Sequence, residues 1–206
     1  MKRLLKVLGV ILAIALLTGG ALILHGERQQ TRAVQSAGLP IAPVYQFDYP
    51  AAVCFAAGEY KSVATSGCGA TCMSMVIGYL TGNEDQSPQS LFEQAWQNGD
   101  YYGYGLSHAA LDRLARANGV AGTWIGRDEK TLRRALREGR PVIAHMGPGQ
   151  FADEGHYILL RGLTDDGRVV MNDPNSKENT GRAFVLSLFL DVAKTYTPFM
   201  VCRPMD

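Results

Sequence analysis

The sequence predicts an α+β fold in which a helix beginning at Cys68 packs on a mostly antiparallel sheet, with one transmembrane helix preceding this domain. Apolar residues recur at helical spacing between Cys68 and Gly139, whereas the residues after Pro141 form short strand-like runs. Helices placed ahead of strands that are joined by tight turns are typical of α+β domains. The transmembrane helix is predicted from an uncharged, mainly apolar stretch, Val7–Leu24, that follows a cluster of cations.

The start of the chain has the composition of a membrane-targeting segment. Lys2, Arg3 and Lys6 precede the uncharged stretch Val7–Leu24, which is at the short end of what spans a bilayer and long for the core of a signal peptide. No small-x-small cleavage site follows, so residues 1–25 are predicted to be a signal anchor rather than a removed signal peptide. The cations keep the N-terminus in the cytoplasm. We expect a single-pass protein of the cell membrane whose domain is extracytoplasmic, or a secreted protein if the segment is cleaved.

The rest of the chain is predicted to form a linker and one domain. Residues 26–44 are polar near their start and contain Gly38, Pro40 and Pro43, which suits a flexible linker. Residues 45–206 are enough for one well-packed domain and leave little room for a second. The formal net charge is +1, with both signs mixed along the sequence. No basic face for a nucleic acid is therefore expected.

Four helices are predicted ahead of the strands. The residues from Cys68 to Leu80 are almost all uncharged, with apolar side chains at helical spacing, and Gly82 ends the run. We expect a buried helix that begins at Cys68. Each of the next three helices follows a capping side chain and stops at a glycine. They begin after Ser87, Ser107 and Asp128 and end at Gly99, Gly119 and Gly139.

Strands are predicted from residue 142 onward. Val142–Met146 is a short apolar run. Tyr157–Leu163 and Arg168–Asn172 flank the turn Asp165–Gly167, so they are expected to form a hairpin. Tyr196–Arg203 is expected to add a further strand near the C-terminus.

Cys68, His156 and Asp173 occur in an order that suits a thiol nucleophile, its base and an orienting carboxylate. At a helix N-terminus the dipole lowers the pKa of the Cys68 thiol, and backbone N–H groups surround an attacked carbonyl. His156 opens one strand of the hairpin and Asp173 closes the other, so the turn returns both to the same end of the sheet. The carboxylate then receives an imidazole N–H and holds the other ring nitrogen toward the thiol. Adjacent Asn172 is the competing orienter, but strand alternation turns the two side chains to opposite faces.

The remaining histidines and Cys72 are interpreted as structural. Cys72 lies one helical turn beyond Cys68, where packing in the core is favoured over chemistry. His108 and His145 are interpreted as structural or surface residues rather than as second bases. A zinc site is not expected, because Cys68, Cys72 and His156 have no fourth ligand at metal-site spacing. No other cofactor is predicted.

The four cysteines must also be considered in an oxidising compartment, where thiols tend to pair. Cys68 and Cys72 share one face of a helix and lack the geometry that a disulfide prefers. Cys54 and Cys202 remain as the plausible pair. The alternative is that both are isolated buried thiols.

Four segments follow one another in the sequence: Gly67–Val76, Leu136–Ile143, Gly155–Gly162 and Asn172–Pro174. In residues and in order, they resemble the bacteriocin-processing peptidase family, a papain-like family that cleaves leader peptides after a double glycine. The resemblance covers about Tyr45 to Arg203 and is to stand-alone relatives that lack a transporter. It implies a papain-like cysteine peptidase fold, a peptide or protein substrate, Cys68 as nucleophile, His156 as base and Asp173 as orienter.

Two features depart from the family pattern. Papain-like peptidases have a glutamine six residues before the nucleophile that completes the oxyanion hole, but Ser62 stands at that position here. Ser62 or a neighbouring backbone N–H is therefore the candidate second oxyanion donor. The sequence also has no Gly-rich phosphate-binding loop of an export ATPase, so cleavage after a double glycine is not implied.

These observations predict a membrane-anchored, extracytoplasmic cysteine peptidase that hydrolyses peptide bonds through a Cys-His-Asp triad and a thioester acyl-enzyme. Its partners are a peptide or protein substrate and, through the N-terminal helix, the membrane. Two alternatives remain open. One is a catalytically silent papain-like domain that binds peptides or cell-wall material, and the other is a cell-wall amidase, because the same triad serves any amide.

Overall fold

The computed structural model describes residues 16, 20, 26, 33, 34 and 36–205 of the chain. The predicted membrane segment Val7–Leu24 lies outside the described residues, apart from Leu16 and Gly20. Among the described residues, no helix has the length and apolar character needed to cross a membrane. The chain divides into two compact units, Met1–Ser36 and Ala37–Asp206. The described residues of the first unit are helical, and the second unit contains the sheet and every predicted site residue.

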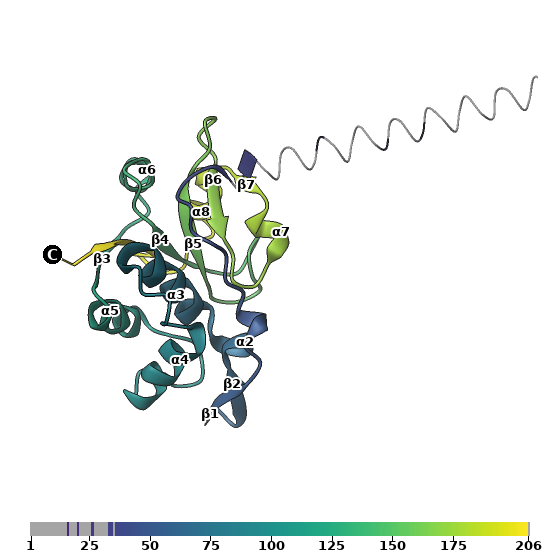
Figure 1. Cartoon of the computed structure of the whole chain (residues 1–206). Helices are drawn as coiled ribbons and strands as arrows, with labels where there is room; N and C mark the ends of the chain where they lie inside the picture. Colours follow the sequence, from purple (N-terminus) through teal and green to yellow (C-terminus); the bar gives the residue numbers. More distant parts are fainter. Residues whose placement is uncertain (1–15, 17–19, 21–25, 27–32, 35, 206) are drawn as a thin grey trace, which may run out of the picture. The chain divides into compact units, whose positions relative to one another are not determined.

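The centre of the second unit is a six-stranded sheet in the order β3-β8-β4-β5-β6-β7, in which every neighbouring pair is antiparallel (Figure 1). A separate two-stranded ribbon, β1-β2, projects beyond the helices. The strands are β1 (Ala52–Ala56), β2 (Glu59–Ser62), β3 (Val120–Ile125), β4 (Val142–Met146), β5 (His156–Leu163), β6 (Val169–Asn172), β7 (Ala183–Phe184) and β8 (Phe199–Pro204).

The helices lie on both faces of this sheet and are stopped where the sequence predicts. The cap side chains of Ser87, Ser107 and Asp128 each accept a backbone N–H, and Gly82 ends α3 in the left-handed conformation with φ of 71°. The helical elements are η1 (Gln46–Asp48), α2 (Val63–Ser66), α3 (Cys68–Thr81), α4 (Pro88–Gln97), α5 (His108–Ala117), α6 (Glu129–Arg137), α7 (Lys177–Thr180) and α8 (Leu186–Asp191). The four predicted helices are therefore confirmed.

Two cores form because the central strands are buried on both faces. Along β4, Ile143 packs with α3, α4 and α5, whereas its neighbours Val142 and Ala144 pack with α6 and α8. The same alternation divides β5 between Leu159 on one side and Ile158 on the other. Side chains of a strand alternate between its two faces, and when both faces are buried the sequence of the strand is a continuous apolar run. The predicted packing of the Cys68 helix on a mostly antiparallel sheet is confirmed.

Several elements were absent from the sequence prediction. The β1-β2 ribbon, β3, β7 and the short helices α2, α7 and α8 were not expected. The strand β3 pairs along its whole length with β8, with Val120 opposite Pro204 and Ile125 opposite Phe199. The sequence of β3, with Gly122 near its centre, has only a weak preference for a strand. Pairing with a segment distant in the sequence therefore stabilises it.

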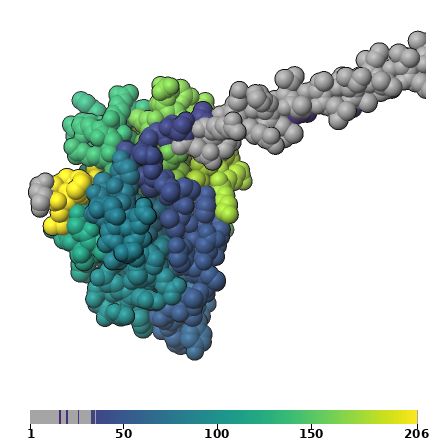
Figure 2. All heavy atoms as spheres, in the orientation of Figure 1, coloured from purple at the N-terminus to yellow at the C-terminus, as the bar shows by residue number. Residues whose placement is uncertain are grey.

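The linker predicted over residues 26–44 ends earlier than expected, because the compact unit begins at Ala37. The backbone N–H of Leu39 donates to the carbonyl of Arg161 at 2.7 Å, and Ile41 is buried in the core. Figure 2 shows the first residues of this unit lying across its surface. Ile41 lies in the core, and Leu39 and Val44 pack against it. Residues 37–44 are therefore part of the compact unit.

The predicted Cys54–Cys202 disulfide is not formed, and the alternative of two free thiols holds. Cys54 belongs to the projecting β1-β2 ribbon, whereas Cys202 belongs to β8 inside the main sheet. The Cys202 thiol is fully buried and donates to the carbonyl of Met200 at 3.5 Å. Each thiol therefore serves as a small apolar side chain in the core.

Candidate active site

Cys68 is the first residue of α3, and it is partly exposed. Gly67 caps the helix, and a Cβ at that position would lie 2.6 Å from the Cα of Val63. Only glycine therefore lets α2 pass directly into α3. Gly69 allows a second close approach, because its Cβ would lie 3.2 Å from the Tyr157 ring on β5. These two glycines bring the N-terminus of α3 against the sheet and fix the position of the Cys68 thiol.

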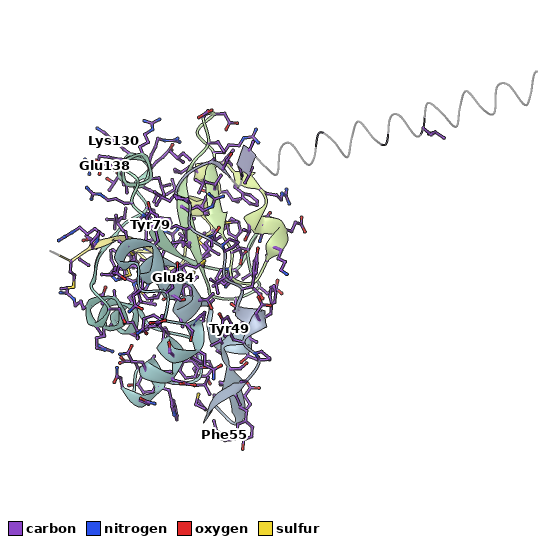
Figure 3. All side chains as sticks on the ribbon, in the orientation of Figure 1. Tyr49, Phe55, Tyr79, Glu84, Lys130 and Glu138 are labelled. Atoms are coloured by element: carbon purple, nitrogen blue, oxygen red, sulfur yellow. The ribbon has the colours of Figure 1, made fainter. Side chains whose placement is uncertain are left out.

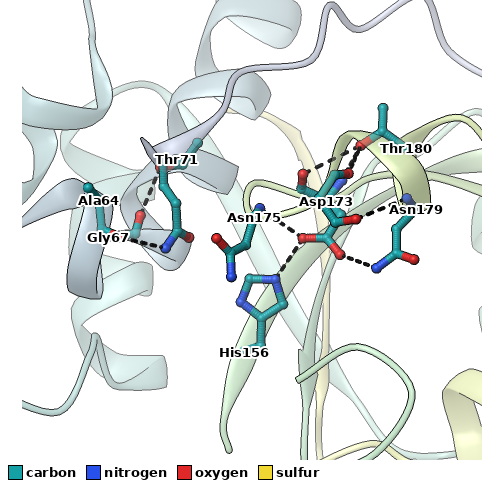
Figure 4. Close-up of polar contacts among 10 residues, drawn as sticks. Ala64, Gly67, Thr71, His156, Asp173, Asn175, Asn179 and Thr180 are labelled. Atoms are coloured by element: carbon teal, nitrogen blue, oxygen red, sulfur yellow. Dashed lines mark hydrogen bonds and ion pairs between the residues drawn. The ribbon is translucent and has the colours of Figure 1, made fainter. Parts of the chain in front are cut away.

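His156 begins β5 and Asp173 follows the last residue of β6, and both side chains are buried. Nε2 of His156 donates to Oδ1 of Asp173 at 2.8 Å (Figure 4). The Asp173 carboxylate also accepts the backbone N–H of Asn175 at 2.9 Å and Nδ2 of Asn179 at 2.8 Å. The backbone N–H of Asp173 donates to the hydroxyl of Thr180 at 2.9 Å. The helix α7 and the loop before it thus hold the carboxylate in one orientation.

Asn172, the competing orienter, is turned away from the imidazole. Its Nδ2 donates to the carbonyl of Ile41 at 2.9 Å, in the core beneath α3. The alternation of side chains along β6 therefore separates Asn172 from Asp173, and of these two residues Asp173 is the one that hydrogen-bonds to His156.

The charges of the three groups are coupled. Burial by itself raises the pKa of the Cys68 thiol, but the hydrogen bond and charge of His156, with the N–H groups of Tyr157 and Gly69, bring the pKa below its ordinary value of 9.0. Burial by itself lowers the pKa of His156, but its hydrogen bonds to Asp173 and Cys68 raise that pKa to about 10. A lowered thiol pKa beside a raised imidazole pKa shifts the pair toward a thiolate and an imidazolium.

Cys68 and His156 line a cavity of about 890 Å³. Its walls come from the β1-β2 ribbon, from residues 103–106 and from residues 152–157. Figure 3 shows Phe55 near the tip of the ribbon, away from the main sheet. This volume is within the range of pockets that bind ligands.

Gln46 is a candidate site residue that the sequence analysis missed. It is buried, lines the same cavity, and donates from Nε2 to the carbonyl of Ala64 at 3.0 Å. Its Oε1 has no hydrogen-bond partner among the described residues. Counting back from Cys68 does not find it, because the β1-β2 ribbon is inserted between Gln46 and α3.

Ser62, which that count selected, is not among the residues that line the cavity. It precedes α2, where its backbone N–H donates to Oγ1 of Thr65 at 3.0 Å and the two hydroxyls lie 3.5 Å apart. These contacts form a capping box, so the geometry gives Ser62 a structural role at the start of α2.

Of the residues interpreted as structural, Cys72 is fully buried in the core, where burial raises its pKa well above the ordinary value. His145, in contrast, lines the same cavity as Cys68 and His156 and contacts His108. Within the described part of the chain, no group of three or more His, Cys, Asp or Glu side chains is arranged to hold a metal ion.

Comparisons with known proteins agree with this architecture. A sequence model of the Peptidase_C39 like family matches residues 39–199. The peptidase domain of Streptococcus ComA, described as a bi-functional ABC transporter involved in a quorum sensing pathway, is structurally similar, with a TM-score of 0.52 and 17% identity over 68% of this chain and 93% of that chain. No curated protein matches this chain. The structural likeness establishes a papain-like α+β fold, and because the family model covers most of the chain, this protein belongs to the Peptidase_C39 like family and is a cysteine peptidase.

Proposed function

We propose that this protein is a membrane-anchored peptidase that hydrolyses peptide bonds outside the cytoplasm with Cys68 as nucleophile, His156 as base and Asp173 as orienter. The observation that carries the proposal is the His156–Asp173 hydrogen bond in the cavity that Cys68 shares at the N-terminus of α3, with a lowered thiol pKa and a raised imidazole pKa. The family match supports the reaction class. The cation cluster ahead of the apolar stretch Val7–Leu24 supports the location.

The reaction follows from the protonation states. The Cys68 thiolate attacks the carbonyl carbon of the scissile amide, forming an S–C bond and a tetrahedral oxyanion. His156 gives the proton of the ring nitrogen that faces the thiol to the leaving nitrogen, the C–N bond breaks, and a thioester remains. Water then attacks the thioester carbon and gives a proton to His156, and the breaking C–S bond restores the thiolate. Asp173 keeps the ring oriented throughout.

Gln46 is proposed as the side-chain donor of the oxyanion hole, together with backbone N–H groups at the start of α3. A primary amide carries two N–H bonds, and the contact with Ala64 uses one of them. The second is available to an oxyanion in the cavity that Gln46 and Cys68 share. Donors held in advance around the developing charge are a large part of the catalytic effect in acyl transfer.

The site assignment is tested by covalent labelling with an electrophilic peptide probe. Cys68 should become the labelled residue, and Cys68→Ala should abolish labelling and turnover. Cys72→Ala is the matched control, because it removes a thiol one helical turn away that is fully buried. Labelling that persists in Cys68→Ala would refute the mechanism.

The outcome of the same assay separates the alternatives. A catalytically silent binding domain would bind peptide and leave Cys68 unlabelled. A cell-wall amidase would release stem peptides from purified wall fragments and leave linear peptides intact.

The location is tested by adding protease to spheroplasts: the domain should be digested while the membrane is whole, and protection until lysis would contradict an extracytoplasmic domain.

A further inference from the structure

A second pair of hydrogen-bonded side chains borders the catalytic cavity. Nε2 of His108, at the start of α5, lies 3.1 Å from Nδ1 of His145 on β4. The His108 ring stacks on the indole of Trp124, with centroids 3.6 Å apart and planes 11° apart. The His145 ring stacks on Tyr157, with centroids 4.2 Å apart and planes 23° apart. Each imidazole is therefore held by one stacked aromatic ring and by its contact with the other imidazole.

The second ring nitrogen of His145, Nε2, is not used by the contact with His108. His145 lines the cavity together with Cys68 and His156, whereas His108 is not among the lining residues. A Cβ placed on Gly155 would lie 3.5 Å from Nε2 of His145 and 2.7 Å from Nζ of Lys194. Gly155 immediately precedes His156, so Nε2 of His145 lies beside the backbone next to one of the proposed reacting groups.

His145 is uncharged at neutral pH. Burial lowers its pKa to about 4. Electrostatic interactions with His108 on α5, Lys194 before β8 and His156 on β5 act in the same direction. Burial also lowers the pKa of His108, against the opposing charge of Asp112. One proton then lies between the two rings, and Nε2 of His145 remains a neutral hydrogen-bonding group.

We propose that His145 binds the substrate: its Nε2 hydrogen-bonds to the main chain of the bound peptide next to the scissile bond, and His108 is a positioning residue that fixes the ring. This inference rests on the proposed peptidase function of the same cavity. A neutral imidazole suits a peptide main chain, which offers neutral N–H and C=O groups and no net charge. If His145 were purely structural, as the sequence suggests, its Nε2 would have no role.

The test compares two substrates. The first is a fluorogenic peptide amide, chosen from a library for turnover by the unaltered protein, and the second is p-nitrophenyl acetate, which acylates a thiolate without extending along the cavity. His145→Phe keeps a ring to stack on Tyr157 and removes the hydrogen bond. For the peptide amide we expect KM to rise about tenfold at unchanged kcat. Hydrolysis of p-nitrophenyl acetate should be unchanged, and His145→Gln should restore part of the peptide affinity.

His108→Phe tests the positioning role, because it preserves the stack on Trp124. The KM for the peptide amide should rise less than in His145→Phe at neutral pH. The pH below which KM rises should also shift upward, because His108 is one of the groups that lower the pKa of His145, while burial, the largest cause, remains. A purely structural residue would not introduce this shift. Tyr196→Phe, on a side chain that is 96% exposed, is the control.

The outcomes separate this inference from the proposed function. If the unaltered protein cleaves neither substrate and Cys68 is not labelled, both proposals fail. If the unaltered protein is active and His145→Phe leaves the peptide KM unchanged, the role of His145 is overturned and the peptidase stands. An equal loss with both substrates would also overturn it, because it would mean that the variant disturbs Tyr157 and Cys68 rather than peptide binding.

Discussion

His156 donates a hydrogen bond from Nε2 to Oδ1 of Asp173 at 2.8 Å, with both side chains at most 6% exposed. The two residues are 17 positions apart in the sequence and meet because β5 and β6 are antiparallel neighbours. The contact turns the other ring nitrogen toward Cys68, so one interaction sets both the orientation and the charge of the imidazole.

The roles of Asp173 and Asn172 separate in substitutions. Asp173→Ala should lower kcat/KM by roughly 10²-fold, because the imidazole loses its orientation and its charge partner. Asp173→Asn should cost less, since an amide still orients the ring. Asn172→Ala should leave kcat/KM near normal and lower the melting temperature, because the amide of Asn172 bonds to Ile41 in the core. Steady-state kinetics with one peptide amide measures all three, and loss at Asn172 with normal activity at Asp173 would reverse the assignment.

Substitutions of Gln46 and Ser62 should have opposite effects on catalysis and on stability. Gln46→Ala should lower kcat by about 10²–10³-fold with little change in KM. Ser62→Ala should weaken the cap of α2 and cost about 1 kcal/mol of stability, with kcat nearly unchanged. Kinetics combined with thermal unfolding distinguishes the two effects. A large kcat loss in Ser62→Ala but not in Gln46→Ala would return the oxyanion role to Ser62.

Activity should depend on pH through the Cys68–His156 pair. Turnover needs the thiolate and the imidazolium, so kcat/KM should rise through the lowered pKa of Cys68 and fall as pH rises through about 10, where His156 loses its proton. In Asp173→Ala the alkaline limb should move to lower pH, because the hydrogen bond that raises the pKa of His156 is gone. Ultraviolet absorbance of the thiolate follows the same titration. An alkaline limb that does not move in Asp173→Ala would contradict this coupling.

The same pair links folding stability to pH. The pKa of His156 is about 10 in the folded protein against an ordinary 6.5, so between these values the folded state holds a proton that the unfolded chain releases. The stabilisation is fully present below 6.5 and is lost as pH rises through about 10. Denaturant unfolding of the unaltered protein and of His156→Ala across this range measures it. Parallel stability curves for the two proteins would contradict the raised pKa.

Gly67 is predicted to be irreplaceable at the start of the nucleophile helix. In Gly67→Ala the new Cβ meets the Cα of Val63 at 2.6 Å and its carbonyl oxygen at 2.8 Å, and backbone atoms do not yield as a flexible side chain does. We expect a loss of about 1–3 kcal/mol of stability and displacement of Cys68. Gly78→Ala in the same helix is the control, with nothing nearer than 3.9 Å, and should stabilise by about 0.5–1 kcal/mol. Equal behaviour of the two variants would refute the steric argument.

The cysteines should differ sharply in reactivity. Iodoacetamide should modify Cys68 in the folded protein, because its pKa is lowered and its thiol is partly exposed. Cys72 and Cys202 should react only after unfolding, because both are fully buried and burial raises the pKa of each. Reductant should leave the melting temperature unchanged, because no disulfide joins Cys54 to Cys202. Peptide mapping identifies which cysteines are modified. A linked Cys54–Cys202 pair in protein purified from its native compartment would contradict the free thiols.

The sequence by itself determined the local features of this protein. Caps and glycines placed the four helices, as with Ser87 before α4 and Gly82 after α3, because helix ends depend on side chains within a few residues. The hairpin β5-β6 followed from its turn residues and predicted that His156 and Asp173 would meet, which they do. The family and the peptidase class also followed from the segments around these residues.

Only the tertiary structure decided the features that depend on contacts between distant segments. The pairing of β3 with β8, the free state of Cys54 and Cys202, and the docking of residues 37–44 arise from packing that no local pattern encodes. Gln46 could not be found by spacing, because the inserted β1-β2 ribbon separates it from Cys68 in the sequence while the fold returns it to the same cavity. His145 was interpreted as structural for the same reason: period-two alternation tells which side chains share a face of a strand, but the cavity that such a face borders is set by the elements packed around it.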